Sequence, residues 1–118
     1  METREAIFDL QYSEKIKSGL IIGTGLLEQL ASLKEDEFSG GKKVLIWYME
    51  GLRREIWIAE NVLGPGHYGE LERKVMEAIG RIQMSQYMDA QRSFSEAISL
   101  ATTSCQSSMS LLMEKELI

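Results

Sequence analysis

The stretch that decides the fold runs from Lys42 to Leu63 and reads KKVLIWYMEGLRREIWIAENVL. Wound as a helix of about 100° per residue, it places apolar side chains in one stripe whose spacing alternates between three and four residues. That stripe consists of Leu45, Met49, Leu52, Ile56, Ala59 and Leu63. The alternation is typical of a helix packed against other helices, so the stretch predicts a core helix of a bundle.

A second apolar band lies beside the stripe and widens it to an arc of roughly 200°. The band holds Trp47, Val44, Ile58, Val62 and Tyr48. Because a surface helix needs a narrower arc, we expect this helix to contact two or more neighbours. Gly51 lies within the band, where a missing side chain lets another backbone come close.

The N-terminal third of the chain follows the same helical spacing. Its stripe consists of Tyr12, Ile16, Gly19, Gly23, Leu26, Leu30 and Leu33. We predict one helix from about residue 4 to about residue 34. A glycine inside a helix costs roughly 1 kcal/mol relative to alanine, so Gly19 and Gly23 indicate either close approach by another helix or a kink.

A different fold has to be weighed for residues 20–50. Leu20 to Gly25 resembles a strand entering a glycine-rich phosphate turn, and the later VLIWYME run resembles a second strand ending in an acid, as at the start of a dinucleotide-binding fold. Against this, Glu28 occupies the third glycine position, and no further strand follows Glu50. The helical prediction is therefore preferred.

Glycine, proline and helix-capping residues in the rest of the sequence divide the chain into four helices. Residues 34–43, KEDEFSGGKK, read as a connector in which Ser39 could cap the next helix. Gly64-Pro65-Gly66-His67 is the strongest turn signal. Near Met84 the apolar stripe shifts by roughly 110°, which predicts a break before Asp89, with Ser85 or Asp89 as the cap, or else one long helix that changes partners.

These observations predict an all-α single domain over residues 1–118, an antiparallel four-helix bundle with helices at about 4–34, 42–63, 67–85 and 89–117. The net charge of −5 argues against general nucleic-acid binding. Cys105 is the only cysteine, which excludes an internal disulfide and fits a reducing cytoplasm. The N-terminal METREAIFDL lacks a signal-peptide core, and no apolar run reaches the roughly 20 residues of a membrane span. We expect no cofactor and no metal.

Five residues are candidates for an interface or a ligand site. Glu55 falls inside the apolar arc, where a carboxylate must be paired, protonated or directed into a pocket. Trp57 stands on the polar face of the same helix near Arg53 and Arg54, and tryptophan and arginine are enriched at interface hot spots. His67 is the only histidine, and its turn position favours a surface or helix-end role over chemistry.

The leading functional prediction is a non-enzymatic helical interaction module or accessory subunit that associates with itself or with a protein partner. The alternative is a small-molecule-binding or catalytic bundle with a carboxylate pocket near Glu55. A continuous apolar face left bare on the monomer favours the first. An enclosed pocket lined by Glu55 and a basic group favours the second.

Overall fold

Four helices follow one another along the chain: α1 (Thr3–Ala31), α2 (Glu35–Leu63), α3 (Gly69–Gln83) and α4 (Tyr87–Glu114). The computed structural model describes residues 1–118 and contains no strand. The predicted all-α four-helix bundle is thereby confirmed. The dinucleotide-binding alternative is wrong, because residues 20–25 lie inside α1.

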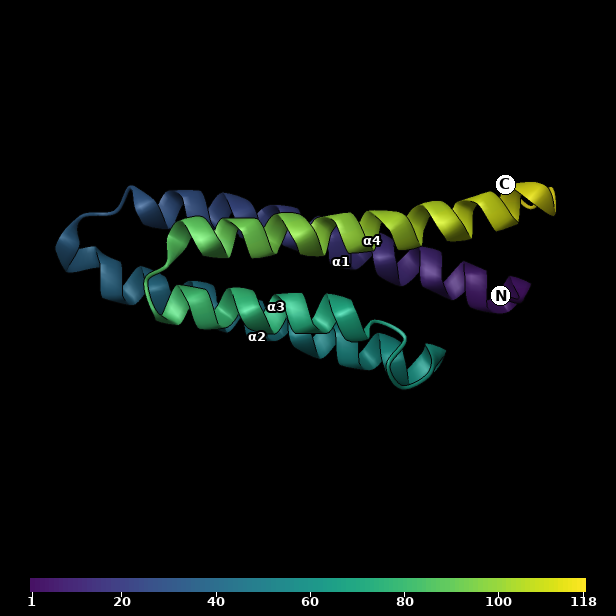
Figure 1. Ribbon diagram of the computed structural model, residues 1–118, viewed down its shortest axis with the longest axis horizontal. Helices are drawn as coiled ribbons and strands as arrows, with labels where there is room; N and C mark the ends of the chain where they lie inside the picture. The colour runs from purple at the N-terminus through teal and green to yellow at the C-terminus, as the bar shows by residue number, and fades with distance from the viewer.

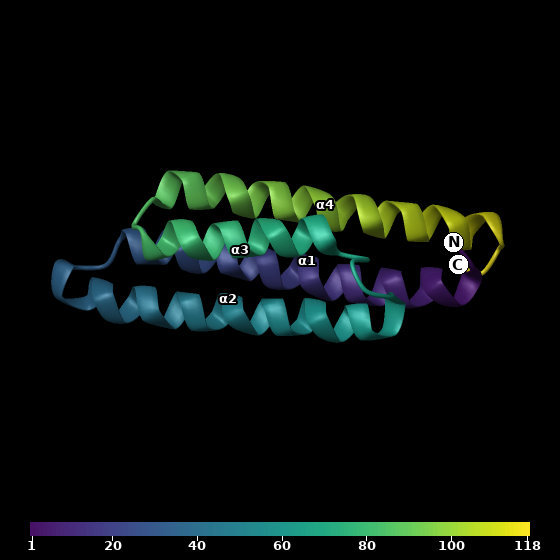
Figure 2. The same cartoon turned by 60° about the horizontal axis from the view of Figure 1, so that its bottom comes forward.

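The helices form an elongated antiparallel bundle of 54 × 22 × 17 Å (Figure 1). Each helix contacts the two that adjoin it in the ring α1, α2, α3, α4. The first turns of α1 and the last turns of α4 extend past the α2–α3 turn, and both termini lie at that end (Figure 2). Lys115 Nζ donates a hydrogen bond to Thr3 Oγ1 at 2.8 Å there. The α1–α4 pair is therefore the longest contact in the bundle.

The apolar stripe of α2 packs in the core as predicted, but the second band does not. Leu45, Met49, Leu52, Ile56 and Ala59 are buried. In contrast, Val44, Trp47, Ile58 and Val62 are exposed. The helix contacts two neighbours, α1 and α3, yet neither of them covers this band. The prediction of two or more neighbours is confirmed, and four side chains of the second band stay bare on the monomer.

Two glycines of α1 permit the closest helix packing. A Cβ atom at Gly23 would lie 2.8 Å from Phe94 Cε1 and 3.3 Å from Met49 Sδ, and one at Gly19 would collide with the side chain of Leu52. The predicted close approach is thus confirmed, and α1 continues through both residues. At Gly51 nothing lies within 4 Å of a Cβ position. The expected close approach at Gly51 is therefore wrong within the chain.

The helix α2 begins earlier than predicted, at Glu35, so most of the expected connector is helical. The Glu37 side chain accepts a hydrogen bond from the Lys34 backbone N–H at 3.2 Å, which caps the first turn. Acidic residues in that turn also stabilise the helix, because their negative charges interact favourably with the positive end of the helix dipole. Phe38 packs edge-on against Tyr87 at 5.3 Å between ring centroids. These contacts offset the helix cost of Gly40 and Gly41.

The predicted break between the last two helices is confirmed. Ser85 adopts a left-handed conformation, with φ of 61°, between the end of α3 and the start of α4. The capping prediction is wrong, because Gln86 occupies the cap position and makes no side-chain cap hydrogen bond. Asp89 instead lies in the first turn of α4 and pairs with Arg81 at 3.4 Å.

Candidate functional site

A buried polar cluster is centred on Asp9, whose side chain is only 2% exposed in the second turn of α1. His67 Nε2 lies 2.8 Å and the Tyr68 hydroxyl 2.7 Å from Asp9 Oδ1. From α4, the Ser104 hydroxyl lies 2.8 Å from both carboxylate oxygens, and the Ser108 hydroxyl donates to Oδ2. One carboxylate therefore joins α1, α4 and the start of α3.

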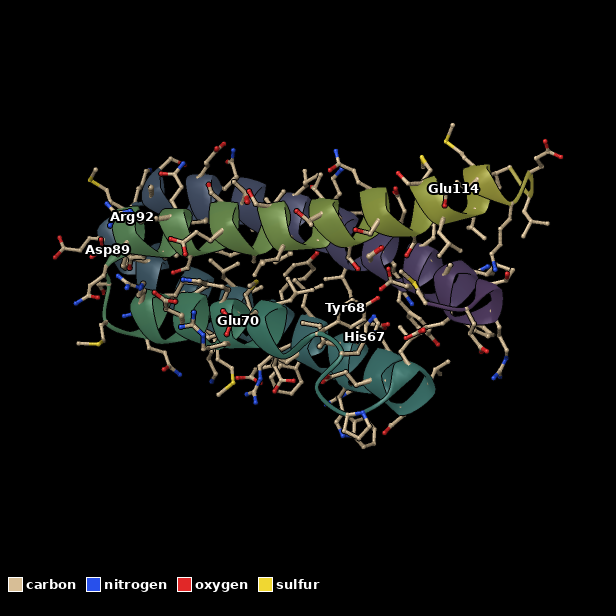
Figure 3. All side chains as sticks on the ribbon, turned by 45° about the vertical axis from the view of Figure 1, so that its right-hand side comes forward. His67, Tyr68, Glu70, Asp89, Arg92 and Glu114 are labelled. Carbon is tan, nitrogen blue, oxygen red and sulfur yellow. The ribbon has the colours of Figure 1, made fainter.

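Local sequence explains how these groups meet. Gly64 and Gly66 have φ values of 117° and 79°, which side chains rarely adopt, and they turn the chain sharply after α2. The turn delivers His67 and Tyr68 to the α1–α4 pair, and Figure 3 shows both residues directed toward it. Tyr68 is anchored further by its backbone N–H, which donates to Glu60 Oε2 at 3.2 Å.

The cluster stabilises the ionised form of Asp9. Burial alone raises the pKa of this carboxyl, but hydrogen bonds from Ser108, Tyr68, His67 and Ser104 outweigh burial and hold the pKa below its usual value. Burial raises the pKa of Tyr68, and its hydrogen bond to Asp9 raises it further. At neutral pH the cluster is therefore a carboxylate with a neutral phenol.

The hydroxyls of the cluster donate to the carboxylate and not to the imidazole. Ser104 and Ser108 donate to Asp9 and not to His67, so no hydroxyl is activated by the imidazole. The second ring nitrogen, His67 Nδ1, lies 3.9 Å from Glu5. Burial raises the pKa of the Cys105 thiol, so the thiol stays protonated at neutral pH. The cluster fastens the α2–α3 turn to α1 and α4.

This cluster makes stability depend on pH in the acid range. The folded-state pKa of Asp9 lies below its unfolded value of about 3.9, so the contribution of Asp9 to stability is complete above roughly pH 4 and is lost as the pH falls through the folded pKa. We expect the urea concentration at the unfolding midpoint to decrease when the pH is lowered below roughly 4. The Asp9→Asn protein should lose less stability on acidification than the unmodified protein. An equal loss of stability in the two proteins would refute the assignment of this pH dependence to Asp9.

The structure brings three of the sequence candidates together on the outer side of α2 and α3. Arg53, Arg54 and Trp57 line a shallow hollow of about 440 Å³ with Glu50 and Glu72. Arg53 pairs with Glu50 at 3.2 Å, and Trp57 is 62% exposed. Burial, together with a hydrogen bond to Glu60, raises the pKa of Glu72. The hollow thus combines an exposed indole with nearly balanced charges.

The other two candidates lie apart from this hollow. Glu55 pairs with Lys15 of α1 at 3.0 Å, and its side chain is 35% exposed, so the carboxylate that interrupts the apolar arc is paired across the α1–α2 contact. His67 belongs to the Asp9 cluster. The predicted helix-end position of His67 is correct, but its role in anchoring the turn was not foreseen.

A bare apolar surface lies on the side of α1 and α2 that faces away from α3 and α4. We call it the α1–α2 outer face, and it comprises Ile22, Leu26, Leu33, Val44, Trp47 and Ile58. The exposed fractions of these side chains range from 37% to 81%, with Trp47 the most exposed. Leu26, Leu33 and Val44 border a groove of about 240 Å³ between the two helices.

The part of this face on α1 is free of charge, because the positions at helical spacing are Ser18, Ile22, Leu26, Gln29 and Leu33. On α2 the face holds Gly40, Val44, Trp47 and Gly51, with the exposed charges of Lys43 and Glu50 beside Trp47 and Arg54 between Gly51 and Ile58. At the far end, Lys15 pairs with Glu55. The sequence prediction placed Trp47, Val44 and Ile58 in an apolar band whose excess width was the signal for this surface, but spacing alone did not give which residues of α1 complete it.

Comparison of the chain with protein-family models, curated proteins and solved structures finds no match. None of the four helices combines the length and the apolar character that crossing a membrane requires.

Proposed function

We propose that the protein is a non-enzymatic helical interaction module, or an accessory subunit, that associates with a second copy of itself through the α1–α2 outer face. The observation that carries this proposal is the exposure of six apolar side chains on one face of the α1–α2 pair. Together they present on the order of 500 Å² of apolar surface, in the upper part of the range for the largest patch on a monomer. Patches of this size mark interaction sites more often than chance.

The polar features of the molecule support a non-enzymatic role. Each hydroxyl of the Asp9 cluster donates to the carboxylate, whose lowered pKa makes it a weak base, and no hydroxyl donates to the imidazole of His67. The alternative, a ligand or catalytic pocket near Glu55, has less support because Lys15 already neutralises that carboxylate. The net charge of −5 disfavours nucleic acid as a partner. A single, buried and reduced cysteine fits a cytoplasmic location.

The two tryptophans allow the proposal to be tested by fluorescence. In the Trp57→Phe protein, emission from Trp47 should move to shorter wavelength as the concentration rises, because association removes the indole from water. In the Trp47→Phe protein, emission from Trp57 should stay constant. A constant Trp47 spectrum would contradict the proposal, and a shift of Trp57 alone would transfer the interface to the α2–α3 hollow.

A further inference from the structure

The inference that follows rests on the proposed self-association and concerns how two copies meet. We infer that they pair about a twofold axis parallel to the helices, with Trp47 of each copy packed over Gly25 of the other.

Trp47 and Gly25 lie at the same level on neighbouring helices. Gly23 of α1 adjoins Met49 of α2, with 3.3 Å between its Cβ position and Sδ. Because α1 and α2 run antiparallel, two residues forward on α1 correspond to two residues back on α2. Gly25 is therefore level with Trp47.

The two residues have complementary shapes, because Trp47 projects a large side chain from α2 and Gly25 leaves a gap on the surface of α1. Trp47 is 81% exposed, the highest value among the tryptophans and other apolar residues of the α1–α2 outer face. Gly25 lies in the interior of α1, exposed at the border of the α1–α2 outer face three residues after Ile22, and nothing within 4 Å would meet a Cβ there. A helix-interior glycine costs roughly 1 kcal/mol relative to alanine, and no contact within the chain accounts for Gly25. A large side chain from another molecule, packed against α1 at this position, would explain why the residue is glycine.

Rotation about a twofold axis parallel to the helices leaves each residue at the same height along the bundle. It also places α1 of one copy opposite α2 of the other across the interface. It therefore places Trp47 over Gly25 of the second copy, and the same contact forms twice. In this arrangement α1 of one copy packs antiparallel on α2 of the other, which helix dipoles favour. Self-complementarity of this kind identifies a second copy, rather than an unrelated helix, as the occupant.

Area and charge agree with this occupant. Two such faces bury on the order of 1,000 Å² of apolar surface, and rim residues bring the total near the lower limit of specific interfaces, about 1,200 Å². The chain carries a net charge of −5, so association through a charged face would set like charges against each other. The α1–α2 outer face is mainly apolar and is bordered by charges of both signs, Lys43, Glu50 and Arg54, so it does not carry the excess negative charge of the chain. We therefore expect a reversible dimer of moderate affinity.

A matched pair of glycine substitutions tests the contact. Gly25→Gln fills the gap, so the dimer dissociation constant measured by sedimentation equilibrium should rise at least tenfold, while the melting temperature of dilute monomer rises slightly. Gly80→Gln is the control, because Gly80 lies in α3 with open space at its Cβ position. It should give the same rise in melting temperature with an unchanged dissociation constant. A dimer equally sensitive to both changes, or to neither, would overturn the inference.

A distance measurement gives an independent test of the axis. A nitroxide label on Gln11→Cys, in a Cys105→Ala background, marks an exposed position of α1 fourteen residues from Gly25 in each copy. A parallel axis brings the two labels to the same height along the bundle, below roughly 30 Å apart, whereas a perpendicular axis at the height of Gly25 separates them by roughly 42 Å at about 1.5 Å of rise per residue. A dimer showing the longer distance would refute the axis and leave the proposed function standing. A chain that stays monomeric at every concentration would refute the proposed function itself.

Discussion

Replacement of Asp9 by alanine is expected to lower the free energy of unfolding by about 3–5 kcal/mol, the cost of breaking a buried charged network. The Tyr68 and Ser108 hydroxyls would remain buried without their acceptor. Each donor left unsatisfied costs about 1–3 kcal/mol, so the loss is large for a single carboxylate. The α2–α3 turn would also lose its attachment to α1. Urea unfolding followed by far-ultraviolet circular dichroism measures the effect.

Asp89→Ala is the matched control for this prediction. Asp89 is a half-exposed acid near the start of α4 that pairs with Arg81, and surface pairs contribute about 0–1 kcal/mol. A loss below about 1 kcal/mol for Asp9→Ala would place it in the same class as this surface pair. The Asp9 cluster would then have no anchoring role.

Replacement of Trp47 by arginine is expected to weaken self-association at least a hundredfold, as for a central hot-spot residue worth about 3 kcal/mol. The change removes the largest apolar side chain of the α1–α2 outer face and buries a cation opposite an apolar surface. Folding should be nearly unaffected because Trp47 is 81% exposed in the monomer. Sedimentation equilibrium gives the dissociation constant, and thermal unfolding at low concentration reports the monomer.

Trp57→Arg provides the control for this second prediction. Trp57 is also on α2 and is 62% exposed, but it borders the α2–α3 hollow instead of the α1–α2 outer face. Its replacement should leave the dissociation constant unchanged. If Trp57→Arg weakens association and Trp47→Arg does not, the interface has been placed on the wrong side of α2.

The heptad stripe of α2 was sufficient to predict the bundle, because Leu45 to Ala59 pack as their spacing requires. The start of α2 was missed because Gly40 and Gly41 were read as a connector. The Glu37 cap and the packing of Phe38 on Tyr87 outweigh the cost of these glycines. Such a tertiary contact between distant residues has no signal in the local sequence.

The Asp9 cluster could have been found in part. Asp9 and Ser13 continue the buried spacing of Ile16 and Leu20 toward the N-terminus, so two polar residues occupy core positions of α1. The buried face of α4 is also polar near Ser108. A polar stretch on each of two long helices indicates that they pair there. The contribution of the α2–α3 turn depends on the path of the backbone, which spacing alone does not give.

The bare second band of α2 marks the limit of pattern analysis. The sequence shows that Val44, Trp47 and Ile58 form an apolar band, but not whether the covering helix belongs to the same chain. The structure leaves these side chains uncovered. A second copy of the chain is the occupant that we propose.

Sedimentation equilibrium of the unmodified chain over a wide concentration range is the most direct test of this account. We expect a reversible transition from the monomer mass of 13.4 kDa to twice that value as the concentration rises. A mass of 13.4 kDa at every concentration would contradict the central claim that the α1–α2 outer face binds a second copy.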